Sequence, residues 1–159
     1  MAEKLYISAE GYRRLADELH TLMTVERPKV VNTVAAAAAE GDRSENAEYI
    51  YGKKRLRQID RRVEFLTRHL DRLEVAAPPT ATDRVRFLSY VEIENQDGEE
   101  KCYRIVGADE TDAKAGWISW KSPVGSALLG KRLDDEVRVR TPGGFVELTI
   151  VGIHARRPI

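Results

Sequence analysis

The sequence predicts an α+β protein in two parts: an N-terminal antiparallel helical hairpin, or coiled coil, and a C-terminal domain with a mostly antiparallel sheet and one short helix. Two patterns and the break between them support this prediction. Apolar residues recur every three or four positions through residues 12–73, and every second position in runs after residue 83. Ala76-Ala77-Pro78-Pro79-Thr80 ends the helical pattern. We therefore expect a hairpin over residues 1–76, a linker over 77–82 and a second domain over 83–159.

The first arm of the hairpin is predicted to begin at Ser8, a favourable N-cap, with Glu10 in the first turn, where the helix dipole favours an anion. Pro28 removes one backbone hydrogen bond and predicts a kink rather than an end of the helix. The alanines at 35–39 keep the arm helical and make it thin, because alanine is the best helix former and is small. The apolar seam of this arm comprises Tyr12, Leu15, Leu19, Leu22, Val30 and Val34.

The returning arm has a more regular seam, with spacings that alternate between three and four as in a coiled coil. Its members are Leu56, Ile59, Val63, Leu66, Leu70 and Leu73. Ala47 and Ile50 are the apolar residues expected to continue it toward the turn. Two such seams joined by about six residues fold back on each other as an antiparallel pair. Arms of about thirty residues would extend for roughly 45 Å.

Strands are predicted beyond the linker, where apolar and polar residues alternate. The predicted strands cover Arg84–Glu94, Lys101–Val106, Gly116–Trp120, Glu136–Arg140 and Phe145–Ile153. Asn95-Gln96-Asp97-Gly98 is typical of a hairpin turn. Ser122 is expected to cap a short helix over Pro123–Leu129, with the proline in its first turn.

Composition excludes several classes of protein. Lys+Arg and Asp+Glu both number 26, so no global excess of positive charge is available for nonspecific nucleic-acid binding. The single cysteine, Cys102, cannot form an intramolecular disulfide, which favours a reducing compartment and a cytoplasmic location. No pair of histidines or cysteines has zinc-site spacing, and no apolar stretch is long enough to span a membrane.

The turn between the two arms carries two carboxylates, Asp42 and Glu45, within Gly41-Asp42-Arg43-Ser44-Glu45-Asn46. One interpretation is structural, because Asp-x-x-Glu is a capping box in which Asp42 caps the second helix and Glu45 reaches back. Capping leaves part of each carboxylate unused, and one or two carboxylates suffice to hold Mg²⁺ when substrate phosphates and water complete its shell. The pair is therefore also a candidate metal site.

A stripe of positive charge follows the turn along the second arm. At about 100° per residue, Lys54, Arg57 and Arg61 lie on one helix face with Lys53 beside them, opposite the apolar seam. Arg55 and Arg62 flank the other side. A solvated helix face is the simpler interpretation, but such faces usually mix their charges more evenly. A stripe of this kind on a shaft with acids at its end is suited to holding a phosphate backbone.

Several segments of the sequence resemble those of a known protein family. The segments that carry the likeness are Gly41–Tyr49, Tyr51–Arg57, Ile59–Val63, Tyr103–Gly107, Ser122-Pro123 and Ala127–Lys131. Together they closely resemble the bacterial transcript cleavage (Gre) factors, and the long basic run is most similar to the GreB branch. Glu48 stands where an aspartate is also common in the family.

The resemblance implies a coiled coil inserted into the secondary channel of RNA polymerase and an FKBP-like C-terminal domain that docks outside it. It implies no independent active site: Asp42 and Glu45 would help the polymerase hold a Mg²⁺ ion that promotes hydrolysis of backtracked RNA. Lys53, Lys54, Arg57 and Arg61 would contact the 3′ segment of the nascent RNA. Ser122 and Pro123 are expected near the polymerase-docking surface, and the chain is expected to be monomeric.

Two other functions fit parts of the sequence. A channel-binding regulator could occupy the polymerase without promoting cleavage, and a cleavage assay separates the two. The FKBP-like fold also suggests a prolyl isomerase, but fold does not imply activity and the domain shows no obvious apolar proline pocket in its sequence.

Overall fold

The computed structural model describes residues 5–41 and 46–159, which form two compact units. One unit is the hairpin, with described residues from Tyr12 to Leu73; the other joins Leu5–Gly11 to Glu74–Ile159. The sequence-based division kept residues 1–76 together, whereas the contacts group Leu5–Gly11 with the C-terminal unit.

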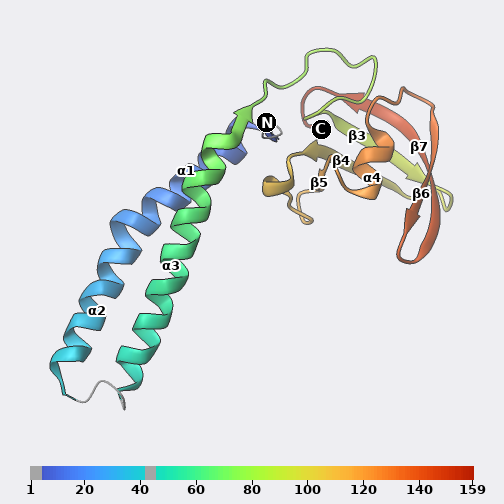
Figure 1. The fold of residues 1–159 in the computed structure, drawn as a ribbon. Coiled ribbons are helices and arrows are strands. Elements are labelled where there is room, and N and C mark those ends of the chain that lie inside the picture. The colour runs from blue at the N-terminus through green and yellow to red at the C-terminus, as the bar shows by residue number, and fades with distance from the viewer. Residues whose placement is uncertain (1–4, 42–45) are drawn as a thin grey trace. The chain divides into compact units, whose positions relative to one another are not determined.

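The hairpin consists of α1 (Ala9–Thr21), a π-helix η1 (Leu22–Glu26) and α2 (Arg27–Ala39), with α3 (Ala47–Arg72) running back beside them (Figure 1). The predicted coiled-coil pairing is confirmed, because the seam residues are those withdrawn from solvent. Leu15, Leu22, Ile59 and Leu66 are all at most 9% exposed, and the residues on either side of each are mostly exposed.

Pro28 changes the first arm locally without ending it. It stands in the first turn of α2, directly after η1, and the backbone N–H of Arg27 donates to the carbonyl of Leu22. This bond spans five residues instead of four. Since proline lacks an N–H and crowds the carbonyl four residues before it, the wider turn accommodates the ring while the helix continues. The predicted interruption therefore takes the form of a π-helix.

Small side chains let the two arms pack closely near the turn. Ala37 on α2 is 2% exposed, and a Cβ placed on Gly52 of α3 would come within 2.6 Å of Val34 Cγ2. Gly52 therefore continues the seam behind Leu56. The prediction that Ala47 and Ile50 do so is wrong, since neither is buried. A step of four residues back from Leu56 leads to Gly52, which an apolar pattern cannot reveal because glycine has no side chain.

The C-terminal unit is built on a five-stranded sheet of order β5-β4-β3-β7-β6, antiparallel except between β4 and β5 (Figure 1). Its elements are β3 (Tyr90–Asn95), β4 (Glu100–Val106), the 3₁₀ helix η2 (Ala108–Glu110), β5 (Trp117–Ser119), α4 (Pro123–Leu128), β6 (Glu136–Thr141) and β7 (Gly144–His154). Leu128 of α4 joins the buried core on one face of the sheet with Val91, Ile93, Ile105 and Ile150. The Asn95–Gly98 turn joins β3 to β4 as predicted, and Asn95 Oδ1 accepts hydrogen bonds from the N–H groups of Asp97 and Glu99.

The strand predicted over Arg84–Glu94 is correct only from Tyr90 onward. Val85 is buried, but its backbone bonds to Gly130 and Lys131 instead of to a strand. Leu88 is fully buried with φ of 73°, a left-handed conformation that no regular strand contains. The alternation over residues 85–88 therefore reflects burial in a looped segment.

A buried carboxylate holds the N-terminal segment to the C-terminal unit. Glu110, 4% exposed, accepts hydrogen bonds from the N–H groups of Ser8 at 2.8 Å and Gly107 at 2.9 Å, and from the Ser8 hydroxyl. Ser8 Oγ in turn accepts from the N–H of Gly11 at 3.0 Å, which confirms Ser8 as the N-cap of α1. The strand β1 (Leu5–Ile7) also pairs with β2 (Leu73–Val75). These bonds are why Leu5–Gly11 belongs to this unit.

The contact between Gly52 and Val34 yields a prediction about stability. Gly52→Ala should lower the free energy of unfolding by about 1–3 kcal/mol, because the added methyl forces the arms apart. At an ordinary exposed helix position the same change stabilises by about 1 kcal/mol. Denaturant unfolding followed by the helical circular dichroism signal measures the difference.

The double variant Gly52→Ala/Val34→Ala is the control for this prediction. Truncation of Val34 gives the new methyl room, so the double variant should be destabilised by less than the sum of the two single effects. A Gly52→Ala protein more stable than the wild type would contradict the close packing.

Candidate functional site

The two candidate metal-binding carboxylates, Asp42 and Glu45, lie outside the described residues, as does the rest of 42–45. The structure describes the residues on either side of them. Gly41 has φ of +125°, a conformation that glycine adopts readily and other residues rarely do. Asn46 marks the start of α3. The structure therefore describes the two residues that flank the candidate site, and the site itself stays a prediction.

Asn46 fixes the start of α3 and ties it to the end of α2. Its side-chain oxygen accepts from the N–H of Tyr49 at 3.1 Å, and its Nδ2 donates to the carbonyl of Ala37 at 2.9 Å. Asn46 is thus the N-cap of α3, so the capping-box interpretation, in which Asp42 caps this helix, is wrong. The second helix does not need Asp42 for its cap.

The basic run on α3 divides into two groups. Arg55 and Arg62 form ion pairs with the first arm: Arg55 Nη2 lies 3.4 Å from Glu26, and Arg62 donates two hydrogen bonds to Glu18 at 2.8 and 2.9 Å. A third pair has the opposite polarity, from Arg27 Nε to Asp60 at 2.8 Å. This hydrogen bond, together with the charge of Asp60, raises the pKa of Arg27. These cations serve to join the arms.

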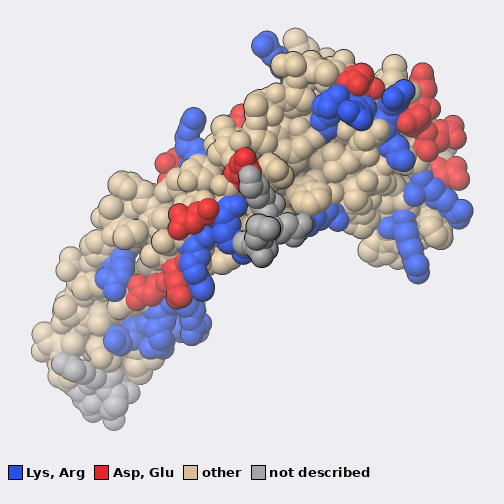
Figure 2. Space-filling view, turned by 45° about the horizontal axis from the view of Figure 1, so that its top comes forward, with Lys and Arg blue, Asp and Glu red and all other residues tan. Residues whose placement is uncertain are grey.

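The four residues of the predicted stripe form the other group. Lys54, Arg57 and Arg61 are exposed and Lys53 is half-buried. Within residues 5–41 and 46–159, none of the four has an ion pair. Figure 2 shows lysine and arginine side chains along the hairpin on the face drawn, with acidic side chains between some of them. The stripe is therefore a positively charged surface of α3 that forms no ion pair with the described residues of this chain.

Ser122 and Pro123, the predicted docking residues, begin α4 as expected. The Ser122 hydroxyl donates to the carbonyl of Ser119 at 2.6 Å and accepts from the N–H of Gly125 at 3.0 Å. Pro123 occupies the first turn of the helix and is exposed. The cap accounts structurally for Ser122. Contact with a partner stays a prediction for both residues.

Two negative findings concern the described residues alone. Outside positions 1–4 and 42–45, no three histidine, cysteine, aspartate or glutamate side chains come together to hold a metal ion. In the same part of the chain, no helix is both long and apolar enough to cross a membrane.

The sequence did not reveal two polar features of the C-terminal unit. Glu110 is a buried hydrogen-bond acceptor, and Arg104 is 6% exposed on β4. Glutamate and arginine are rarely buried, so position alone gave no sign of either. A weak signal exists for Arg104, since it stands directly before the apolar residues Ile105 and Val106.

Comparison with known proteins places the whole chain in one family. The model for the N-terminal domain of transcription elongation factors matches residues 5–75, and the model for the C-terminal domain of GreA/GreB factors matches residues 79–155. The chain belongs to the GreA/GreB family of transcription elongation factors. The predicted resemblance is thereby confirmed.

Relatives place this Gre factor close to GreB. It is 55% identical over 151 residues to transcription elongation factor GreB of Haemophilus influenzae, covering 94% of this chain and 96% of the relative. It is 51% identical over 157 residues to GreB of Yersinia pestis, covering 98% and 92%. A solved structure described as prokaryotic transcription elongation factor GreA/GreB from Nitrosomonas europaea is 25% identical and covers 96% of this chain and 99% of that one, with a TM-score of 0.42.

The two hydrogen bonds of Asn46 can be separated by substitution. Asn46→Ala should lower the stability of the hairpin by about 1 kcal/mol, the usual effect of removing an N-cap side chain. Asn46→Asp keeps the acceptor for the Tyr49 N–H and removes only the donor to Ala37, so it should retain most of that energy. Amide exchange at Tyr49 measures the cap directly. Equal protection of this amide in both variants would contradict the role assigned to Asn46.

Proposed function

We propose that this Gre factor inserts the end of its helical hairpin into the secondary channel of RNA polymerase and stimulates cleavage of backtracked nascent RNA. Membership in an elongation-factor family indicates a protein that regulates transcription and has no catalytic activity of its own. The observation that supports the finer proposal is the division of the basic run. Arg55 and Arg62 pair within the hairpin, whereas Lys54, Arg57 and Arg61 remain exposed and without ion pairs among the described residues.

The stripe lies at a useful distance behind the acids. Lys53 to Arg61 stand six to fourteen residues after Ala47, the first residue of α3, which at ~1.5 Å per residue corresponds to roughly 9–21 Å of helix. A single strand of extruded RNA carries a phosphate at every nucleotide, so several phosphates fall within this length. Lysine and arginine on one helix face can follow them, and each contact releases counterions. The stripe would hold the RNA 3′ segment while the acids act on a bond further upstream.

Asp42 and Glu45 are the residues of this chain that would hold Mg²⁺ together with the polymerase. The donor set fits the ion, since Mg²⁺ is commonly held by one or two carboxylates with phosphate oxygens and water completing the shell. When bound, the ion supplies Lewis-acid assistance to hydrolysis of a phosphodiester bond. The contribution of the chain is to carry the two carboxylates at the end of a stiff arm. Because Asn46 caps α3, Asp42 is not committed to that role.

The first functional prediction concerns the carboxylates. Asp42→Asn and Glu45→Gln should each reduce cleavage in a backtracked elongation complex to the rate of polymerase alone, since a neutral amide binds Mg²⁺ weakly. Binding to the polymerase should persist. Glu48→Gln, which changes an acid in the first turn of α3, is the matched control and should cleave normally.

RNA sizing by gel electrophoresis measures the effect. Cleavage at the wild-type rate in either variant would refute the metal-holding role. A wild-type factor that binds without accelerating cleavage would instead identify a channel-binding regulator.

The second functional prediction concerns the stripe. Replacing Lys54, Arg57 and Arg61 by alanine should most weaken cleavage of deeply backtracked complexes, because these expose the longest RNA segment. The salt dependence should decrease by a slope of about 0.7 for each phosphate that the variant no longer binds. Crosslinking from the RNA 3′ end to α3 should fall in parallel.

Arg55→Gln/Arg62→Gln provides the control, since it also removes cations from α3 but takes them from ion pairs within the hairpin. It should lower hairpin stability and leave the product lengths unchanged. Unchanged salt dependence and product lengths in the triple variant would make the stripe an ordinary solvated face.

A further inference from the structure

A hollow of about 580 Å³ is lined by residues of the unit that joins Leu5–Gly11 to Glu74–Ile159, and Ser122 and Pro123 are not among them. It is lined by Glu10, Pro78, Pro79, Thr80, Tyr90, Arg104, Ala155, Arg156 and Arg157. Arg104 and Tyr90 face each other across β4 and β3, and Arg156 and Arg157 follow the end of β7. Because Val91 and Ile105 point into the core, their neighbours Tyr90 and Arg104 lie on the opposite face of the sheet.

Arg104 is the fixed element of this hollow. Its side chain is 7% exposed and packs between two rings, with Cζ 5.1 Å from the centroid of Tyr90 and 4.9 Å from that of Trp117. Its Nε donates to the carbonyl of Leu88 at 3.4 Å. These two cation–π contacts hold the guanidinium in place, and its N–H groups can still donate to polar groups.

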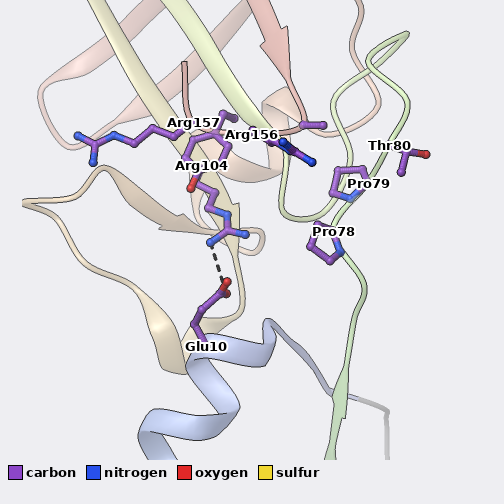
Figure 3. A pocket seen from close by; sticks show the side chains of 9 residues that line it. Glu10, Pro78, Pro79, Thr80, Arg104, Arg156 and Arg157 are labelled. Atoms are coloured by element: carbon purple, nitrogen blue, oxygen red, sulfur yellow. Dashed lines mark ion pairs between the residues drawn. The ribbon is translucent and has the colours of Figure 1, made fainter. Parts of the chain in front are cut away.

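The charge of Arg104 is only loosely compensated. Its ion pair is with Glu10, whose Oε2 lies 3.7 Å from Nη1, beyond hydrogen-bond distance, and whose side chain is 55% exposed. Figure 3 shows the guanidinium of Arg104 directed toward Glu10, with Pro78, Pro79 and Thr80 along one side. A buried guanidinium whose paired carboxylate lies beyond hydrogen-bond distance is incompletely compensated, so an anion that reached its N–H groups would bind favourably.

The other charges around the hollow are mainly positive. Arg156 and Arg157 lie on its rim and are exposed. Burial and the nearby Glu92 carboxylate raise the pKa of Cys102, while the charge of Arg157 opposes them. Glu92 itself lies 3.0 Å from His154 Nε2. The lining residues therefore include three arginines and one carboxylate, that of Glu10.

We propose that this hollow binds the phosphate group of a small organic ligand of nucleotide size. Arg104 makes the central contact, and the exposed Arg156 and Arg157 add positive charge at the rim. Arginine suits phosphate because its planar fork donates two parallel hydrogen bonds. The volume falls within the range of about 300–1,000 Å³ typical of small-molecule sites, and the Pro78-Pro79 wall and the Tyr90 ring provide apolar surface for the organic part.

Glu10 competes with the proposed ligand for Arg104, which predicts a gain of affinity on mutation. Isothermal titration of the intact chain with ADP, inorganic phosphate, adenosine and a short RNA oligonucleotide tests the ligand class. ADP and phosphate should bind, ADP more tightly, and adenosine should not. Glu10→Gln should tighten ADP binding about fivefold, since it removes a nearby negative charge from a partly screened site.

Arg104→Gln and the double variant Arg156→Gln/Arg157→Gln should each weaken ADP binding at least about tenfold, the effect of removing a charge-assisted bidentate interaction. Arg140→Gln, which changes an exposed arginine on β6 outside the hollow, is the control and should bind normally. If Arg104→Gln fails to fold, the rim double variant and Glu10→Gln still decide the outcome. Absence of ADP binding at millimolar concentration, equal weakening by Arg140→Gln, or binding of the RNA alone would each overturn the proposal.

Discussion

The hairpin depends on a single line of contact between two long helices. A compact domain buries side chains on several sides, but each arm here has only one apolar seam, and the residues beside the seam are mostly exposed. Close approach along this line must therefore supply the stability that a larger core would otherwise give. Gly52 against Val34 and the buried Ala37 permit that approach near the end of the hairpin. The same small residues keep the arms slender where a narrow passage would admit them.

Cross-arm ion pairs complete the hairpin and determine which charges remain available. Glu18 and Glu26 on the first arm engage Arg62 and Arg55 of the second. Exposed pairs of this kind contribute little energy singly, but they fix which arginines point toward the other arm. The remaining cations of the basic run are thereby left on the outer face. Within one charged segment, some cations thus join the two arms and others remain available for binding.

Helices and strands whose buried positions repeat at a regular spacing are the features that the sequence predicts best. The seam from Leu56 to Leu70 and the alternation in β3 were predicted correctly because each burial position carries a side chain of the right kind, whereas Leu73, predicted as the end of the helical seam, begins β2. The packing of Gly52 was not predicted because glycine buries only backbone. The loop at Leu88 was not predicted because a buried leucine gives no sign that its φ is positive. Asp42 and Asn46 are both good caps, and the choice of Asn46 depends on its second bond, to Ala37 of the other arm. The separation of paired from unpaired cations likewise rests on partners 29 and 44 residues away.

The bond between Ser8 and Glu110 joins residues 102 positions apart in the chain. During synthesis on the ribosome, Leu5–Gly11 is therefore made long before the carboxylate that receives it. Both arms of the hairpin are complete by then and can pair through contacts local to themselves. The C-terminal unit, by contrast, includes a segment from the start of the chain, and binding it has the entropic cost of closing a long loop. Leu5–Gly11 are thus among the first residues to leave the ribosome and among the last to reach their native partners.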